Sequence, residues 1–389
     1  VTPPGDIPDE SGHFSYVRDI GNGKFFPLMG EATIPNNLWF NAAEDDPVLS
    51  RIRPNYITQH PPLYYMVAAI PYYASTQLTD DRWHQIRAAR TVSAVSLGLL
   101  VLTLFGTMRD LGVNPAGALL LATSVSLIPT ISHLASGITN DIFLFLLCAV
   151  ATRFLVRFIL QQKTKAAYAC ATLLTLAGAT KMTAWPLVLG ILFVMLFEMR
   201  QPPKRWFAHS FGLSVIALSL PLWWAGRNIY HFGNPFAVHV VSNQPLFLNY
   251  TILDYLKSQP FFDWMVTHSY GLIGFAGYCQ TPETLSQCMG VKSTRVAHQG
   301  FEFVLWSLAI MATLLLAYTV WHYIRQYRTR TAWHGPGSVQ MIIASVLKPG
   351  WSRGALLAVT AAVGGGLFYL ALVHVHRGGG MGWIINPGF

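Results

Sequence analysis

The chain reads DIFLFLLCAVATRFLVRFIL from Asp141 to Leu160, an apolar stretch whose second half carries the cations Arg153 and Arg157. A helix needs about 20 apolar residues to cross the hydrocarbon core of a bilayer, and this stretch has that length. The whole chain shares its character: charged residues make up 11% of it, hydrophobic residues 52%, and the mean hydropathy is +0.39. Ordinary globular proteins carry roughly 25% charged residues. The sequence therefore predicts a polytopic membrane protein rather than two or three soluble domains.

Length and apolarity predict a series of membrane spans along the chain. They cover residues 84–109, 113–135, 141–160, 166–180, 183–199, 207–226, 302–324 and 354–375. Backbone polar groups inside lipid must be hydrogen-bonded within the protein, so each span is expected to be a helix. The expected fold class is an all-α polytopic membrane protein, a bundle of transmembrane helices with large extracytoplasmic loops and juxtamembrane helices.

The basic residues predict which side of the membrane each loop faces. Lys and Arg gather in the short loops between alternate spans, where Asp110 and Glu198 are the only acids. Cytoplasmic loops carry such an excess of cations, so these loops are expected to be cytoplasmic and both ends of the chain extracytoplasmic. The net charge of +9 then reflects topology. No basic cluster lies in a soluble module, so nucleic acid is not an expected partner.

This topology divides the chain into four regions. Residues 1–83 form a first extracytoplasmic loop, which includes a helix over 62–78 expected to lie in the membrane interface. Residues 84–226 form the transmembrane bundle, 227–301 a second large outer loop, and 302–389 the last spans and a loop. A span preceding Val1 and further helices after Phe389 are expected to be missing. Cys279 and Cys288 in the second outer loop are predicted to form a disulfide, with two free thiols as the alternative.

Two acids stand at the start of the first outer loop, Asp9 and Glu10, followed by His13. If a helix begins near Ser11, Asp9 and His13 are four residues apart and share one face. A carboxylate beside an imidazole can act as a general base, and the three side chains could together hold a divalent metal ion. The alternative is that Asp9 or Ser11 only caps the helix.

A second motif, His60-Pro61-Pro62-Leu63-Tyr64-Tyr65, lies later in the same loop. The two prolines stiffen the chain and fix the direction of the imidazole. Tyr64 and Tyr65 offer flat apolar faces on which a sugar ring or a lipid head group can stack. An ordinary aromatic belt at the membrane surface is the alternative.

Three further charged residues lie at outer ends of predicted spans: Asp141, Lys181 and Arg227. Asp141 could cap its helix or belong to a site. Lys181 could reach the interface as a snorkelling lysine or bind a phosphate. Arg227 follows the interface anchor Trp223-Trp224 and could hold a phosphate by bidentate hydrogen bonds, or simply sit in the interface.

The acidic pair, the proline motif and the helical body together resemble the GT-C superfamily of membrane glycosyltransferases. Asp9-Glu10 and His60-Pro61-Pro62-Leu63 are similar to motifs of the protein O-mannosyltransferases, and Pro61-Pro62-Leu63-Tyr64-Tyr65 to one of the lipid A aminoarabinose transferases. Pro8-Asp9-Glu10 with His13-Phe14, and the later stretch Tyr270–Gly277, also resemble a broad group of bacterial membrane proteins in that superfamily. The likeness covers roughly residues 1–235 and implies a GT-C-type bundle.

The resemblance implies transfer of a sugar, with inversion, from a polyprenyl-phosphate donor to a hydroxyl of a glycan, lipid or protein acceptor. It makes Asp9 the base for the acceptor hydroxyl, with Glu10 orienting the acceptor or assisting with a cation. The aminoarabinose transferases have a lysine at the position of His60, where it meets the donor phosphate. The implied localisation is the bacterial inner or plasma membrane, among membrane lipids, with the site on the extracytoplasmic face. No cofactor is expected beyond the divalent metal ion, which stays open.

Two other functions compete with this interpretation. A transporter or flippase of lipid-linked sugars would carry charges through the middle of the bilayer, whereas here the ionisable residues collect near the outer boundary. A non-catalytic membrane subunit with the same fold would not need Asp9, Glu10 and His60 intact. Transfer chemistry at the outer surface is therefore the favoured prediction.

Overall fold

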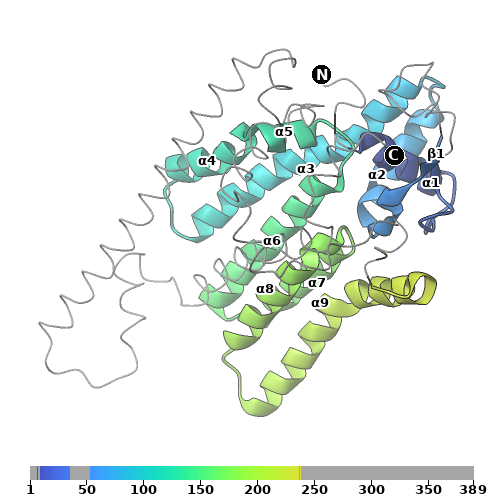
Figure 1. Cartoon of the computed structure of the whole chain (residues 1–389). Coiled ribbons are helices and arrows are strands. Elements are labelled where there is room, and N and C mark those ends of the chain that lie inside the picture. The colour runs from blue at the N-terminus through green and yellow to red at the C-terminus, as the bar shows by residue number, and fades with distance from the viewer. Residues whose placement is uncertain (1–6, 8, 36–52, 236, 238–389) are drawn as a thin grey trace, which may run out of the picture.

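A computed structural model describes residues 7, 9–35, 53–235 and 237 of the chain (Figure 1). The described part is built almost entirely of helices, which confirms the predicted fold class. Three of its helices are long and apolar enough to cross a membrane: Arg82–Asp110, Asn140–Gln161 and Pro203–Phe232. The spans predicted over 302–324 and 354–375, nearly all of the second outer loop, and Cys279 with Cys288 lie outside the described residues.

The N-terminal region is a small helical layer set against the end of the bundle. Helix α1 (Glu10–Gly21) is followed by the two-residue strands β1 (Thr33–Ile34) and β2 (Arg53–Pro54), which pair antiparallel. The 3-10 helix η3 (Tyr56–Gln59) then leads into α2 (Leu63–Thr76). Figure 1 shows α1 and α2 together at one end of α3. Buried aromatic and aliphatic residues from α1, α2 and the start of α3 form one cluster, which fastens this layer to the bundle.

The bundle follows in chain order from α3 to α9 (Figure 1). Its elements are α3 (Arg82–Asp110), α4 (Pro115–Ser124), η4 (Val125–Leu127), α5 (Pro129–Ala135), α6 (Asn140–Gln161), α7 (Thr164–Gly178), η5 (Met182–Ala184), α8 (Trp185–Phe197) and α9 (Pro203–Phe232). Side chains cap several of these helices by accepting a backbone N–H of the first turn. Asp81 accepts from Trp83 in α3, Asn114 from Gly117 in α4, and Thr139 from Asp141 in α6.

The second predicted span, 113–135, is not one continuous helix. It divides into α4, η4 and α5, and the break falls at Ile128, whose backbone is extended (φ −72°, ψ 115°). The physical reason is Pro129, which has no N–H to donate and forces the residue before it away from helical geometry. The prediction of a single helix here was wrong, although all three elements lie within the predicted bounds.

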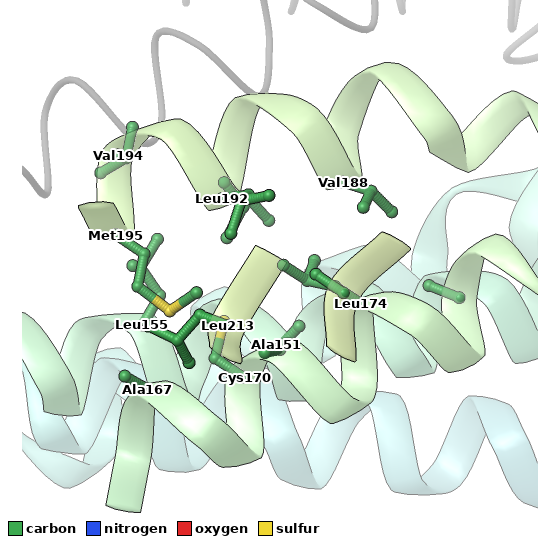
Figure 2. Close-up of a cluster of buried hydrophobic side chains, with 14 of the residues drawn as sticks. Ala151, Leu155, Ala167, Cys170, Leu174, Val188, Leu192, Val194, Met195 and Leu213 are labelled. Carbon is green, nitrogen blue, oxygen red and sulfur yellow. The ribbon is translucent and has the colours of Figure 1, made fainter. Parts of the chain in front are cut away.

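Small residues bring the central helices close together. Figure 2 shows Ala151, Ala167 and Cys170 among larger side chains such as Leu155 and Met195. These belong to a buried cluster drawn from α6, α7, α8 and α9. Small side chains let helix backbones approach closely, which is how helices associate in lipid. Large apolar residues of α9 such as Phe207, Phe211 and Leu222 are instead exposed, as expected of a surface that faces lipid.

One end of the bundle carries an acid shared by two arginines. At the far end of α3, Asp110 accepts hydrogen bonds from Nε of both Arg153 and Arg157, each at 2.8 Å. Gly106 makes room for this arrangement, because a Cβ there would lie 2.3 Å from the Arg153 guanidinium. The residues named as site candidates are found toward the opposite end, where α6 begins and α7 ends.

Candidate functional site

Asp9 stands immediately before α1 in a left-handed backbone conformation (φ 62°, ψ 10°). A non-glycine residue in this region is strained by about 1 kcal/mol or more, and such residues cluster at functional sites. The Asp9 side chain makes no capping hydrogen bond to the helix. Its Oδ1 accepts instead from the hydroxyl of Tyr56 in η3, and the residue is exposed. The alternative that Asp9 merely caps α1 is therefore wrong.

Glu10 is held very differently from its neighbour, because it is 1% exposed and fully engaged. Nε of Arg90 donates to Oε1 and Nη2 to Oε2, both at 2.7 Å, and the backbone N–H of Ile138 donates to Oε1 at 3.1 Å. The paired carboxylate joins α1 to α3 and to the turn before α6. Glu10 thus lies inside the protein, where it cannot meet an acceptor. Arg90 was not named from the sequence, although a cation inside a predicted span is itself a signal of function.

His13 lies one turn after Asp9 and contacts α2 directly and α6 through Tyr65. Its Nδ1 is 2.9 Å from the hydroxyl of Tyr65 in α2, and the two rings stack with centroids 5.7 Å apart. The same hydroxyl accepts from Nδ2 of Asn140, at the start of α6, at 3.2 Å. Burial lowers the pKa of His13 to about 4, outweighing the opposing charge of Asp9, so the imidazole is neutral at pH 7. The sequence did not single out Asn140, which is completely buried.

Tyr64 and Tyr65 are both buried, so neither ring presents an open face for a sugar to stack on. The Tyr64 hydroxyl is 2.9 Å from Oγ of Ser93 in α3. Tyr65 stacks on Tyr16 of α1 at a centroid distance of 4.1 Å. Burial raises the pKa of the Tyr65 hydroxyl well above its ordinary value, so it acts as a neutral hydrogen-bonding group. Both tyrosines connect helices rather than line an open surface.

Asp141 and Lys181 are brought together from α6 and the turn after α7. Lys181 Nζ is 2.6 Å from Asp141 Oδ1, and the Thr139 hydroxyl donates to Asp141 Oδ2 at 3.0 Å. The two charges also act on His13, one lowering and the other raising its pKa. Asp141 is therefore more than a helix cap, because its carboxylate forms an ion pair with the ammonium group of Lys181.

The backbone at the start of the proline motif is hydrogen-bonded to the first and the last described helices, α1 and α9. The backbone carbonyl of His60 accepts from the Tyr16 hydroxyl of α1 at 3.3 Å, and that of Gln59 from the indole N–H of Trp224 in α9 at 3.2 Å. Trp224 also lies under the guanidinium of Arg227, which is 4.3 Å from the ring centroid. These contacts fix the backbone from which the His60 imidazole projects.

Arg227 holds the loop that follows α1. Its Nη2 donates to the backbone carbonyls of Phe26 at 3.3 Å and Pro27 at 3.2 Å. Its Nη1 donates to Oδ1 of the neighbouring Asn228. The guanidinium is thus largely occupied by protein acceptors, and it braces the loop beside the clamped proline motif.

Asp9, Glu10 and His13 do not form a metal-binding set. No group of three His, Cys, Asp or Glu side chains that could hold an ion is found within 7, 9–35, 53–235 and 237. The reason is visible at Glu10, whose two oxygens are taken by Arg90 and by the N–H of Ile138. The residues present do not fit the divalent ion that the sequence left open.

Residues 59–224 match the family model described as dolichyl-phosphate-mannose-protein mannosyltransferase. The match indicates a membrane glycosyltransferase. It confirms the resemblance to the GT-C superfamily and supports an integral membrane protein. The matched stretch contains His60, Asp141 and Lys181, whereas Asp9 and Arg227 lie outside it. No curated protein and no solved structure matches the chain.

Proposed function

We propose that this glycosyltransferase moves a sugar, with inversion, from a polyprenyl-phosphate donor to an acceptor hydroxyl at the end of the bundle where α1 meets α2 and α6. The observation that carries the proposal is the contrast among the three acids gathered there. Glu10 is neutralised by Arg90 and Asp141 by Lys181, whereas the carboxylate of Asp9 has the neutral hydroxyl of Tyr56 as its partner. Asp9 is therefore the acid equipped to accept a proton.

The reaction requires a base on one side of the anomeric carbon and a stabilised leaving group on the other. Asp9 takes the proton of the acceptor hydroxyl while the acceptor oxygen bonds to the anomeric carbon. The bond from that carbon to the phosphate oxygen breaks, and the lipid phosphate leaves with the electron pair. Cations near the departing oxygen stabilise its growing charge. Lys181 and His60 are the proposed phosphate ligands.

Two residues named as candidates take supporting roles in this proposal. Glu10 anchors the first turn of α1 to Arg90 and so holds the preceding residue, Asp9, in place. Arg227 braces the loop after α1 through the carbonyls of Phe26 and Pro27. Both are positioning residues, because neither offers its charged group to a substrate.

Replacing Asp9 with Asn tests the proposal directly. The amide keeps the size of the side chain and can still accept from Tyr56, but it cannot take the acceptor proton. Transfer from a lipid-linked sugar is expected to fall by roughly 100-fold or more, the usual contribution of a general base. Asp19→Asn makes the same change later in α1 and should leave transfer near normal. Full activity of Asp9→Asn would disprove the assignment of the base.

The extracytoplasmic position of the site is part of the same proposal. It is supported by the cations at the other end of the bundle, Arg153 and Arg157 in the second half of α6 and Lys163 just after that helix. Cysteines introduced at Asn22 and Lys163 are expected to react with an impermeant thiol reagent from opposite sides of the membrane. Labelling of both from one side would overturn the orientation and leave the chemistry at Asp9 to be judged separately.

A further inference from the structure

The hydrogen bonds around Tyr65 have a defined direction. Asn140 Nδ2 faces two oxygens, the Tyr65 hydroxyl at 3.2 Å and the backbone carbonyl of Thr180 at 3.5 Å. A carbonyl oxygen can only accept, so the side of the amide that faces Thr180 must be the NH₂ group. Its two hydrogens serve the two oxygens. The Tyr65 oxygen is therefore an acceptor toward Asn140.

The direction continues to His13. Because the Tyr65 oxygen accepts from Asn140, its single hydrogen is available for the other close partner, Nδ1 of His13, at 2.9 Å. An imidazole nitrogen that accepts a hydrogen bond carries no proton, so the neutral ring must carry its proton on Nε2. Burial favours the neutral ring here, since the side chain of His13 is almost fully enclosed at 6% exposure. Among the described residues His13 makes its hydrogen bond through Nδ1, so the Nε2 proton is the one that can serve a substrate.

We propose that Asn140 and Tyr65 form a relay that fixes His13 in the Nε2–H tautomer, so that it is a neutral hydrogen-bond donor to a substrate oxygen beside Asp9. Three helices contribute one member each: α6, α2 and α1. In this form His13 can neither bind a metal through Nδ1 nor act as a base. It can donate to an oxygen lone pair of the sugar or of the acceptor, and so hold the reacting hydroxyl near the Asp9 carboxylate.

The role toward substrate rests on the proposed function, but the tautomer does not. The tautomer is therefore measured first, by nitrogen NMR of the whole chain labelled with ¹⁵N-histidine in lipid nanodiscs at pH 7. The His13 signals are assigned by their loss in His13→Gln. The expected spectrum has an unprotonated, hydrogen-bonded Nδ1 and a protonated Nε2, and Tyr65→Phe should remove the hydrogen-bond shift of Nδ1. A proton on Nδ1, or a Nδ1 signal unchanged in Tyr65→Phe, would overturn the relay.

Transfer assays then test the role of the relay. Tyr65→Phe keeps the ring and its stacking on Tyr16 and His13 but removes the hydroxyl. Transfer is expected to fall by about 3- to 10-fold, the scale of one neutral hydrogen bond. Tyr72→Phe removes a hydroxyl from the same helix outside the relay and should leave transfer unchanged. Equal rates in both variants would overturn the positioning role, whereas an active Asp9→Asn enzyme would instead overturn the proposed base.

Discussion

Arg90 in α3 and Glu10 in α1 form a bidentate ion pair, with both nitrogen-to-oxygen distances at 2.7 Å and both residues buried. The pair connects residues 80 positions apart in the chain. A buried pair of this kind contributes little net stability, because removing two charges from water costs about as much as their attraction returns. The pair instead holds Asp9 in position, since Glu10 directly follows this strained residue.

The first prediction tests whether this ion pair contributes net stability to the fold. Glu10→Leu leaves the Arg90 guanidinium buried without its carboxylate, which typically costs about 3–5 kcal/mol. The double variant Glu10→Leu/Arg90→Leu removes both charges and should recover most of that loss. Thermal unfolding in detergent measures both variants against the unchanged protein. A double variant that is no more stable than the single one would contradict this view of the pair.

Transfer by the double variant is the second readout of the same experiment. If the pair holds Asp9 in place, a stable double variant should still transfer sugar more slowly than the unchanged protein. A stable double variant with normal transfer would show that Asp9 keeps its position without Glu10. The comparison therefore distinguishes a positioning role from a purely structural one.

The second prediction concerns the pH dependence of stability. The pKa of His13 is about 4 in the folded protein and near its ordinary 6.5 when unfolded, because folding buries the ring. Between these two values the unfolded chain binds the proton more readily, so stability falls as the pH is lowered from about 6.5 to 4. The shift corresponds to a loss of about 3 kcal/mol, at 1.36 kcal/mol per pKa unit. Above pH 6.5 this contribution is fully present.

Thermal unfolding at pH 7.5 and pH 5 checks this prediction. The unchanged protein is expected to lose more stability between the two pH values than His13→Gln, which cannot titrate at this position. The same pH dependence in both proteins would show that His13 is not buried in its neutral form.

The sequence was sufficient to predict the class of fold and the positions of most described helices. Long apolar segments carry that information locally, as Asp141–Leu160 does for α6. The break at Pro129 was missed because the segment is apolar on both sides of the proline, and length alone favoured one span. The backbone geometry that proline imposes broke the helix at this point, and the proline itself was visible in the sequence.

The connections within the candidate site could not be predicted in the same way. Local patterns pointed to Asp9, His13, Asp141 and Lys181, but not to their partners. Asn140 was not singled out although it adjoins Asp141, because nothing in its local sequence indicates a partner on a distant helix. Its contact with Tyr65 joins residues 75 positions apart, and such pairing depends on how whole helices pack.

The last prediction concerns the ion pair between Lys181 and Asp141, whose nitrogen and oxygen lie 2.6 Å apart. In the proposed function Lys181 also binds the donor phosphate, so Asp141 and the phosphate compete for one ammonium group. Lys181→Met removes the cation and should weaken donor binding by about tenfold or more, the scale of a hydrogen bond to a charged group. Asp141→Asn removes the competing carboxylate and should strengthen donor binding.

Both variants disrupt the same ion pair. A purely structural role for the pair therefore predicts similar losses of stability in the two variants and no opposite changes in donor binding. The KM for the lipid-linked donor, measured with unfolding temperatures for both variants, decides between the two roles. If both variants raise the KM, Lys181 is not a phosphate ligand.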